Sequence, residues 1–406
     1  MKVLFICHRF PFPPKRGGKI RPFNVIRHLQ QRHEVTVASI VRTPEEAREG
    51  AGLAAHCSGF LMERISPVAA LWRMLRALPT RVPSSMGFFH SPRLARRIER
   101  ELAGSRYDLI FVHCSSVAHY VAGVPGIPRL LDFGDMDSQK WLAYGKTKPL
   151  PLSLGYGLEG WKLQREEAEL AREFDSCTCT TRAELQTLES LVPGVRAGWF
   201  PNGVDTERFR PDDAAYEPHT ISFLGRMDYF PNQQCMFEFC RSTLPLLRER
   251  LPGIRLQIVG ASPSRRVRRL GRLTGVTVTG SVPEVQPFVR RSALTVAPLA
   301  IARGTQNKIL ESLAMGVPVV CSEAAAGGVN VVPGEHLLVC RSPRDYAEAI
   351  LRLLERPDER RRFAVAGRER MVSHHSWESS MRLLDRIIDD CLSGRRGPAV
   401  DERVCR

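Results

Sequence analysis

The sequence predicts an α/β protein made of two domains, each built around a parallel sheet. Short apolar runs rich in Val, Ile, Leu and Phe alternate with longer helical patterns, which favours parallel strands joined by right-handed crossovers. This alternation begins near residue 2 and begins again near residue 220. A chain of 406 residues is long enough for two domains of ordinary size, each with its own core.

The first series of strands and helices occupies the N-terminal half of the chain. Parallel sheets bind ligands at the carboxyl ends of their strands, so the loops that follow these strands are the first places to examine. Strands are expected at Lys2–Cys7, Glu34–Val41, Asp108–His113, Pro128–Phe133 and Asp175–Thr180, and helices at Arg21–Arg32, Pro92–Ala103 and Gly160–Phe174.

The second series follows a turn at Asn202-Gly203, and we expect the chain to pass between domains at residues 202–216. Several of its strands end beside a glycine, which suits loops that touch a ligand. Strands are expected at Thr220–Leu224, Arg255–Val259, Val276–Thr279, Ala293–Ala297 and Val317–Cys321, followed by helices at 344–354, 358–373 and 377–391 and a disordered tail at 393–406.

The composition is that of a soluble globular protein with a strong excess of positive charge. There are 59 basic and 43 acidic residues, a net charge of +16. Such a charge favours nucleic acid, an anionic membrane surface or phosphorylated ligands as partners. No zinc-finger, RNA-recognition or homeodomain signature is present, so specific nucleic-acid binding is not expected. Contact with an anionic membrane surface stays open.

The N-terminus and the cysteines indicate a cytoplasmic protein. Residues 1–7 are too short for a signal-peptide core and read as a first strand, and no apolar run is long enough to span a bilayer. Scattered buried thiols are usual in a reducing compartment, and their spacing does not predict a metal site. Most of the eleven cysteines lie in apolar, strand-like runs: Cys7, Cys114, Cys177, Cys179, Cys321 and Cys340.

The stretch from Gly304 to Val320 reads as a loop, a short helix and a buried strand. Gly304 gives a flexible entry, and Thr305 is expected to cap the helix. Lys308 and Glu311 are the two charged residues on this helix, three positions apart. They form either an exposed ion pair of little energetic value or a ligand clamp, with Lys308 on a phosphate and Glu311 on sugar hydroxyls.

A basic, glycine-containing loop follows the first strand. Gly17-Gly18 lets the backbone approach a ligand closely at the start of the next helix. Basic residues surround this pair, which is neither a dinucleotide-binding nor a Walker A pattern. The alternative is a plain flexible turn with solvated charges. The basic residues are Lys15, Arg16, Lys19 and Arg21.

Three acidic residues follow the strand that ends near Phe133. Asp132, Asp135 and Asp137 lie within six residues of one another. Close carboxylates raise one another's pKa, which suits a base or a group that orients a hydroxyl. One is expected to cap the following helix and at least one to face a ligand, and a metal site ranks last. In the second half, Arg226 directly after Gly225 is expected to reach a phosphate.

Motifs that come in a fixed order give the second half a family likeness. With the 304–320 stretch, they resemble the retaining glycosyltransferases of family four, which have the GT-B fold. The run Asp-Phe-x-Asp-x-Asp-Ser-x-Lys-Trp at 132–141 is similar to sugar transferases associated with PEP-CTERM/exosortase exopolysaccharide systems. The motifs are Pro-Asn-Gly-Val-Asp (201–205), Gly-Arg (225–226), Val-Gly (259–260), Gly-Ser-Val-Pro-Glu (280–284) and Ser-Trp-Glu (376–378).

The resemblance implies two facing Rossmann-like domains with the active site in the cleft between them. An acceptor-binding domain would comprise residues 1–200 and a returning helix at 378–392, and a nucleotide-sugar-binding domain residues 201–377. The resemblance puts the ribose on Glu311, the diphosphate near Arg226, the Gly304–Thr305 loop and Gly17-Gly18, and the base near Ser281-Val282. The remaining donor-site residues it implies are Gly225, Gly260, Lys308 and Ile309.

Three positions depart from the family pattern. Arg303 stands where many members have a first glutamate, eight residues before Glu311. Asn232 replaces a lysine, and Lys308 is the hypothetical substitute for its charge. Gly134 and Asp135 stand where a histidine is common, which puts acceptor activation in doubt.

The resulting expectation is transfer of a sugar from a nucleotide-sugar to a glycan or lipid-linked acceptor, in exopolysaccharide or cell-surface polysaccharide synthesis. Catalysis is assigned to Asp132, Asp135, Arg226 and Lys308, with retained anomeric configuration, no cofactor and no metal. Two alternatives stay open. One is a nucleotide-sugar 2-epimerase of the same architecture, and the other is a non-catalytic subunit that binds an anionic polymer or lipid.

Overall fold

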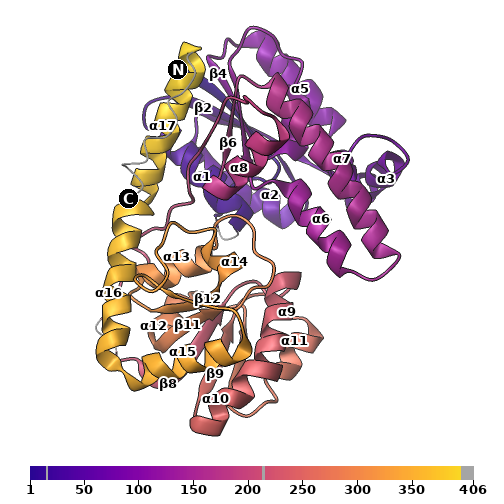
Figure 1. The fold of residues 1–406 in the computed structure, drawn as a ribbon. Helices are drawn as coiled ribbons and strands as arrows, with labels where there is room; N and C mark the ends of the chain where they lie inside the picture. The colour runs from indigo at the N-terminus through magenta and orange to yellow at the C-terminus, as the bar shows by residue number, and fades with distance from the viewer. Residues whose placement is uncertain (15–16, 213–214, 395–406) are drawn as a thin grey trace. The chain divides into compact units, whose positions relative to one another are not determined.

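The computed structural model describes residues 1–14, 17–212 and 215–394, and these fall into two compact units. Unit 1 contains Met1–Phe200 and the last helix from Met381, and unit 2 contains Pro201–Ser380 (Figure 1). The expected tail beyond residue 394 and the loop charges Lys15 and Arg16 lie outside the described residues. Each unit is an α/β domain on a parallel sheet, as predicted.

Unit 1 has a seven-stranded parallel sheet in the order β3-β2-β1-β4-β5-β6-β7. The sequence predicted five of these strands and missed β3 and β7. Both lie at sheet edges; β3 is only partly buried and β7 has three residues, so neither shows a long apolar run. The strands are β1 (Lys2–Cys7), β2 (Glu34–Val41), β3 (Gly59–Arg64), β4 (Leu109–His113), β5 (Arg129–Gly134), β6 (Ser176–Cys179) and β7 (Ala197–Trp199).

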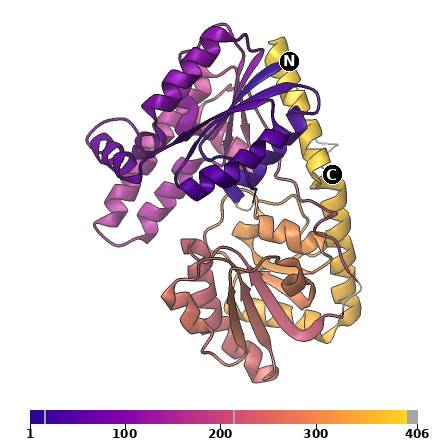
Figure 2. The same cartoon turned by 180° about the vertical axis from the view of Figure 1, so that it is seen from behind.

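Helices cover this sheet on both faces, as the two opposite views show (Figure 2). The last helix, α17 (Trp377–Ser393), returns from unit 2 and packs on unit 1, where Asp385 Oδ1 lies 2.7 Å from His28 Nε2. The others are α1 (Gly17–Leu29), α2 (Pro44–Gly50), α3 (Pro67–Ala77), α4 (Ser84–Phe89), α5 (Pro92–Gly104), α6 (Asp137–Thr147), α7 (Leu152–Glu173) and α8 (Arg182–Leu191).

Unit 2 has a six-stranded parallel sheet in the order β10-β9-β8-β11-β12-β13. Its strands are β8 (Glu217–Leu224), β9 (Arg255–Val259), β10 (Val276–Gly280), β11 (Ser292–Ala297), β12 (Val319–Ser322) and β13 (Leu338–Cys340). Its helices are α9 (Phe230–Glu238), α10 (Leu244–Arg250), α11 (Arg265–Leu270), α12 (Gln286–Arg290), α13 (Asn307–Ala314), α14 (Glu323–Ala326), α15 (Pro343–Glu355) and α16 (Pro357–His374).

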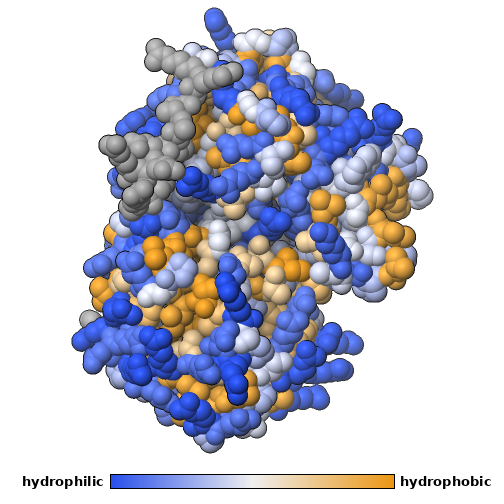
Figure 3. All heavy atoms as spheres, in the orientation of Figure 1, coloured by the Kyte–Doolittle hydropathy of each residue, from blue (hydrophilic) through white to orange (hydrophobic). Residues whose placement is uncertain are grey.

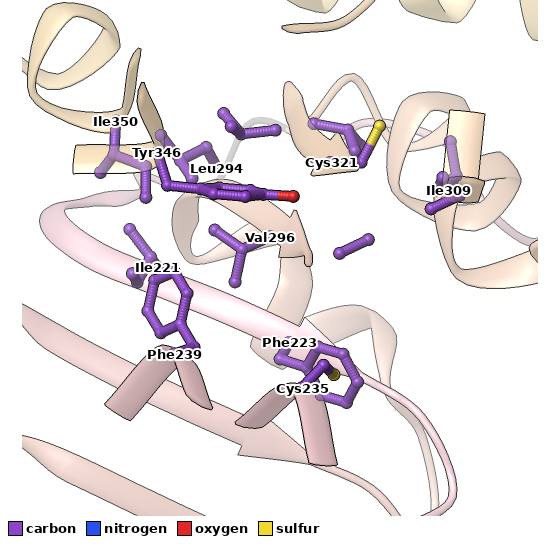
Figure 4. Packing of buried hydrophobic residues seen from close by; sticks show 14 of the residues in the cluster. Ile221, Phe223, Cys235, Phe239, Leu294, Val296, Ile309, Cys321, Tyr346 and Ile350 are labelled. Atoms are coloured by element: carbon purple, nitrogen blue, oxygen red, sulfur yellow. The ribbon is translucent and has the colours of Figure 1, made fainter. Parts of the chain in front are cut away.

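Each unit encloses its own hydrophobic core. In unit 2, Phe239 packs edge-on against Tyr346, with Ile221, Leu294 and Val296 of the sheet beside them (Figure 4). The ten cysteines of the described residues are all buried and unpaired, as predicted. Within the described part of the chain, no helix is both long enough and apolar enough to cross a membrane.

Both sheets reverse direction beside their first strand. In unit 1 the chain runs outward from β1 to β2 and β3, and then returns to β4 on the other side. In unit 2 the same reversal separates β8 from β11. Loops that leave the carboxyl ends of such neighbouring strands diverge and leave a crevice where ligands bind. The loops after β1, β4, β8 and β11 are therefore the candidates.

Candidate functional site

In unit 2, the reversal point is bordered by the loop after β8 and by the segment that leads into α13. Backbone contact is very close here: a Cβ atom on Gly260 would lie 1.8 Å from the carbonyl oxygen of Gly225. A Cβ on Gly328 would likewise lie 1.9 Å from the Gly304 carbonyl oxygen. Only glycine allows these approaches, which accounts for Gly260 and adds Gly328, a residue that sequence reasoning did not single out.

Lys308 is half-buried in the first turn of α13 and has no carboxylate partner within the described part of the chain. Its Nζ donates to Asn232 Oδ1 at 2.7 Å and lies 4.5 Å from the centroid of the Phe223 ring. Asn232 Nδ2 in turn donates to the Arg226 carbonyl oxygen. Burial lowers the pKa of Lys308 to about 8. The ammonium group therefore lies beside the side chain that occupies the family's lysine position.

Glu311 lies one turn further along the same helix and is also half-buried. Within residues 1–14, 17–212 and 215–394, its carboxylate makes no hydrogen bond or ion pair, so the alternative of a Lys308–Glu311 ion pair is not observed. Burial raises the pKa of Glu311 to about 7, and Arg208 and Lys308 lower it only in part. A partly desolvated carboxylate without a partner is costly, which marks a ligand-binding candidate.

The start of α13 differs from the prediction. The N-cap is Gln306 rather than Thr305, and no side chain caps the helix. The hydroxyl oxygen of Thr305 is buried and has no hydrogen-bond partner among the described residues. The first amides of α13 and this hydroxyl therefore lie next to Lys308, where helix N–H groups favour an anion.

Arg226 is tied to Asp228 in this structure. Its guanidinium donates to both carboxylate oxygens of Asp228, with Nε 3.0 Å from Oδ1. Both side chains are more than a third exposed, so the pair contributes little stability and can open for a competing anion. Arg226 therefore lies in the loop directly after β8 with a guanidinium that, among the described residues, only an exposed carboxylate holds.

Three residues of the implied donor site, Ile309, Ser281 and Val282, differ in how far they are buried. Ile309 is fully buried in the unit 2 core, and its amide donates to the Gln306 carbonyl oxygen, so neither its side chain nor its N–H is available to a ligand (Figure 4). That assignment is wrong because the helix turns this residue toward the sheet. Ser281 is exposed after β10, and Val282 packs at the edge of a small cluster around Leu224.

In unit 1, Asp132 is fully buried under five hydrogen-bonding groups. The Arg21 guanidinium binds it through Nε and Nη2 at 2.8 and 2.9 Å. Burial opposes ionisation, but Arg21 and His113 hold the pKa of Asp132 well below its usual range. The remaining contacts are His113 Nδ1 at 2.8 Å, Thr178 Oγ1 at 2.9 Å and the Gly134 amide at 3.2 Å.

This network corrects two expectations. Asp132 has no oxygen directed at a ligand, so a direct role in orienting substrate does not fit; it fixes Arg21 and His113 instead. Arg21 and Lys19 do not surround Gly17-Gly18 with free charge, because Lys19 is paired with Glu46 at 2.8 Å. Arg21 and Lys19 are both buried, and without Asp132 and Glu46 their charges would be unpaired inside the unit.

Asp135 and Asp137 also do not cap α6, whose N-cap is Met136 without a side-chain bond. Asp135 accepts from Thr180 Oγ1 at 2.5 Å, and burial raises its pKa. Asp137 is paired with Lys140. No three His, Cys, Asp or Glu side chains of the described residues are arranged to hold a metal ion together.

Two family models match this sequence and together span most of it. Residues 16–208 match the model described as "Glycosyltransferase Family 4", and residues 218–356 match the one described as "Glycosyl transferases group 1".

The two units carry glycosyltransferase domains.

Named relatives agree with this. A GDP-mannose-dependent alpha-(1-6)-phosphatidylinositol monomannoside mannosyltransferase of Mycobacterium tuberculosis is 30% identical over an alignment of 212 positions, which covers 46% of this chain and 54% of the relative. The chain thus spans little more than half the length of that relative. A D-inositol 3-phosphate glycosyltransferase of Nocardiopsis dassonvillei is 25% identical over an alignment of 322 positions, which covers 72% of each chain.

Solved structures identify the fold of these glycosyltransferase domains as GT-B. Sucrose-phosphate synthase from Thermosynechococcus elongatus has a TM-score of 0.71 at 15% identity, covering 97% of this chain and all of the other. HepE from Anabaena, solved in complex with UDP, has a TM-score of 0.71 at 14% identity, covering 96% of this chain and all of the other. The predicted fold class is confirmed.

Sequence reasoning missed two histidines in the N-terminal glycosyltransferase domain. His8 follows β1 and His113 ends β4, so they lie on the two strands that flank the reversal point, with ring centroids 5.7 Å apart. His8 Nδ1 is buried without a partner among the described residues, and a Cβ on Gly18 would lie 3.9 Å from His8 Nε2. The sequence signal that could have identified them is that each histidine lies at the carboxyl end of an apolar, strand-like run.

Proposed function

We propose that this protein transfers a sugar from a nucleoside diphosphate-sugar bound by unit 2 to an acceptor bound by unit 1. The observation that carries the proposal is the half-buried Glu311 carboxylate, which has no hydrogen-bond or ion-pair partner among the described residues. It lies one turn from the Lys308 ammonium, whose hydrogen-bond partner among the same residues is the neutral amide of Asn232. A ligand with both hydroxyls and a phosphate would satisfy these two groups together.

The donor would lie along the loops at the reversal point of the unit 2 sheet. Glu311 would accept hydrogen bonds from the ribose hydroxyls, and Lys308, the Thr305 hydroxyl and the α13 amides would hold the diphosphate. Gly225 and Gly260 would let the backbone come close to it, with the base near Ser281-Val282. HepE in complex with UDP-glucose and the GDP-mannose-dependent relative support a donor of this class.

Breaking the bond between the sugar and the diphosphate leaves extra negative charge on the departing phosphate. Preorganised cations and helix amides lower that barrier without having to reorganise. Lys308 is well placed for this role, and Arg226 joins it if the Asp228 pair opens. The family likeness supports retention of the anomeric configuration, and we further propose that these protein groups stabilise the leaving group without a metal ion.

In unit 1, Asp135 is the carboxylate best suited to take the proton from the acceptor hydroxyl. Its raised pKa favours proton uptake, whereas the low pKa of Asp132 does not. His113 and Gly18 border the same edge of the sheet. The phosphatidylinositol and inositol acceptors named for the relatives support a lipid-linked or glycan acceptor, and we place the protein in cell-surface polysaccharide synthesis.

The first test is donor affinity of the Glu311→Gln variant, measured by calorimetry with UDP-glucose and GDP-mannose. Losing hydrogen bonds to a charged acceptor should weaken binding roughly ten- to hundred-fold. Glu348→Gln, an exposed glutamate on α15, is the matched control and should bind as the parent does. Unchanged affinity in folded Glu311→Gln for every donor that the parent binds would remove Glu311 from the site.

Two competing functions give different results with the same protein. A 2-epimerase converts the nucleotide-sugar when no acceptor is present, so an epimer formed from donor alone would replace the transferase proposal. A non-catalytic subunit would turn over no donor and would bind an anionic polymer in a salt-sensitive way.

A further inference from the structure

We propose that unit 1 binds the surface of an anionic lipid bilayer through α3 and the start of α7. This membrane face consists of the exposed apolar side chains of residues 68–82 and 150–161. Eleven of the seventeen large apolar side chains that are exposed among the described residues lie in these two short segments. The inference goes beyond the proposed function, because it rests on a different surface and on no residue of the donor site.

Helix α3 has its apolar stripe on the outside. Val68, Leu71, Trp72 and Leu75 recur at helical spacing and are 65, 48, 64 and 42% exposed. The residues that α3 buries are Ala70 and Ala77. A surface helix of a globular domain normally buries its large apolar side chains, so this orientation is the reverse of what folding alone favours. Helices that lie in a membrane interface have this character.

The start of α7 contributes the second part of the membrane face. Leu154, Leu158 and Trp161 are one face of that helix and are 69, 43 and 54% exposed, and Leu150 and Leu152 precede them at 72 and 56%. Helix α6 supports this end of α7, because Trp141 stacks on Tyr156 with ring centroids 5.4 Å apart. The exposed side chains are thus held on a rigid helix pair.

Buried polar contacts join the two parts. Lys162 Nζ donates to the carbonyl oxygens of Ala77 and Leu78, at 3.0 and 2.7 Å, where α3 ends. The Glu159 carboxylate accepts from the amides of Ser84 and Ser85, both at 2.8 Å. Hydrophobic atoms gather over α3 and the start of α7 at the right of Figure 3. The two segments therefore form one surface.

Charge selects a bilayer with anionic lipids as the occupant. Residues 65–82 contain three arginines and no acidic residue, and residues 142–158 contain two lysines and no acidic residue. Glu159 is the one acidic residue within 150–161, and its carboxylate is held by the Ser84 and Ser85 amides. Basic side chains beside an apolar surface attract anionic headgroups, and tryptophan favours the headgroup level. Trp72 and Trp161 are the two exposed tryptophans of the described chain. A protein partner would need acidic groups around an apolar centre, and its occupancy is an outcome of the test.

The test is flotation of the full chain with vesicles of phosphatidylcholine alone or mixed with phosphatidylglycerol. The parent should float with the mixed vesicles and much less with phosphatidylcholine alone. Leu71→Ser with Trp72→Ser, and separately Leu154→Ser with Leu158→Ser, should each lower the vesicle-bound fraction at least roughly tenfold. Val365→Ser with Val372→Ser, two exposed apolar residues of α16, is the matched control and should bind like the parent.

Charge is tested in the same assay. Arg76→Glu with Arg81→Glu should abolish the preference for vesicles that contain phosphatidylglycerol. The control, Arg268→Glu with Arg269→Glu on α11, makes the same change in charge away from the membrane face, and this variant should bind the mixed vesicles better than Arg76→Glu with Arg81→Glu does. The circular dichroism spectrum and the thermal melt, which should stay unchanged in every variant, show that each is folded. Failure of the parent to float with mixed vesicles would overturn the proposal, as would equal binding by the apolar variants. Self-association lost in those variants, without lipid binding, would assign the face to a protein interface.

Discussion

Glu311 and Lys308 make unit 2 less stable at neutral pH, and their ligand would recover that free energy. Burial raises the pKa of Glu311, so its contribution to the free energy of unfolding falls as pH rises from its ordinary pKa to about 7. Burial lowers the pKa of Lys308, so its contribution falls as pH drops from its ordinary pKa to about 8. Between pH 7 and 8 the fold carries both charged forms, a state typical of a binding site.

Donor affinity should therefore be greatest between about pH 7 and 8. Below this window Glu311 becomes protonated and loses its capacity as a double acceptor, and above it Lys308 loses its charge. Calorimetric titration of the nucleotide across pH should give a bell-shaped profile. The acid limb should disappear in Glu311→Gln and the alkaline limb should move up in Lys308→Arg. A profile that stays flat in the parent would contradict the roles given to both residues.

Asp132 and Asp135 should give opposite phenotypes although they lie three residues apart. Asp132→Asn leaves the Arg21 guanidinium without its buried partner, so the free energy of unfolding should fall by about 3–5 kcal/mol. Asp135→Asn can keep the hydrogen bond from Thr180 through its amide oxygen and should cost no more than about 1 kcal/mol. Sugar transfer should fall at least roughly hundredfold, because an amide cannot take up the proton of the acceptor hydroxyl. Denaturant melts and initial rates separate the two effects.

Nucleotide affinity is the control for these two variants, because the proposed donor site lies in the other unit. Asp135→Asn should keep the affinity of the parent. Full transfer activity in Asp135→Asn would remove that carboxylate from the mechanism. A normal melt for Asp132→Asn would show that the buried network does not position Arg21 in the way the contacts indicate.

At the scale of the elements, the unit 2 site depends on how closely β8 and β9 bring their following loops together. The Gly225 amide donates to Val259, and the Met227 amide donates to Ala261, at 3.0 and 2.8 Å. These bonds draw the two loops against each other until Gly260 meets the Gly225 carbonyl. Glycine is required at position 260 because the other loop lies so close, so neither loop shows this requirement by itself.

Gly260→Ala should therefore lose nucleotide binding. Its new methyl group would overlap the Gly225 carbonyl, and separating the loops should also lower the free energy of unfolding by about 2–4 kcal/mol. Gly253→Ala is the matched control, because a Cβ there meets only His219, at 4.0 Å, and it should bind and melt like the parent. Parent-like affinity in Gly260→Ala would mean that the loops can separate without harm to the site.

Element prediction succeeded where periodicity and burial agree. β1, β2 and β9 match their predicted bounds because each is a short run buried on both faces. α13 begins at Asn307 rather than beside Thr305, because the Thr305 side chain points into the protein and makes no cap. The apolar stripe of α3 was not recognised, because periodicity shows that a stripe exists but not which way it faces.

For the whole molecule, two separate cores imply that a ligand of one unit stabilises that unit first. A donor present at a hundred times its Kd should stabilise unit 2 by about 2.7 kcal/mol. Hydrogen exchange with and without UDP-glucose or GDP-mannose should show new protection in the loops after β8 and β9 and in α13. Screening nucleotide-sugars by thermal shift identifies the base and sugar, and Glu311→Gln, which should show a reduced shift, is the control.

Protection confined to unit 1 would contradict the assignment of the donor to unit 2. Equal protection of unit 2 in the parent and in Glu311→Gln would support donor binding by unit 2 but would show that Glu311 does not contribute to it. Either result is independent of the lipid proposal, because the membrane face shares no residue with the donor site.

The sequence by itself determined the two α/β halves, most of the strands and the stretch that holds Lys308 and Glu311. These follow from local patterns, since strand and helix periodicities lie within a few neighbouring residues. Only the tertiary structure decided which charged groups are neutralised. Asp132 in β5 and Glu311 in α13 are both carboxylates, yet Arg21, 111 positions from Asp132, binds the first while no described residue binds the second. Pairing over such separations depends on how the strands are ordered, because order in the sheet brings distant residues together or keeps them apart.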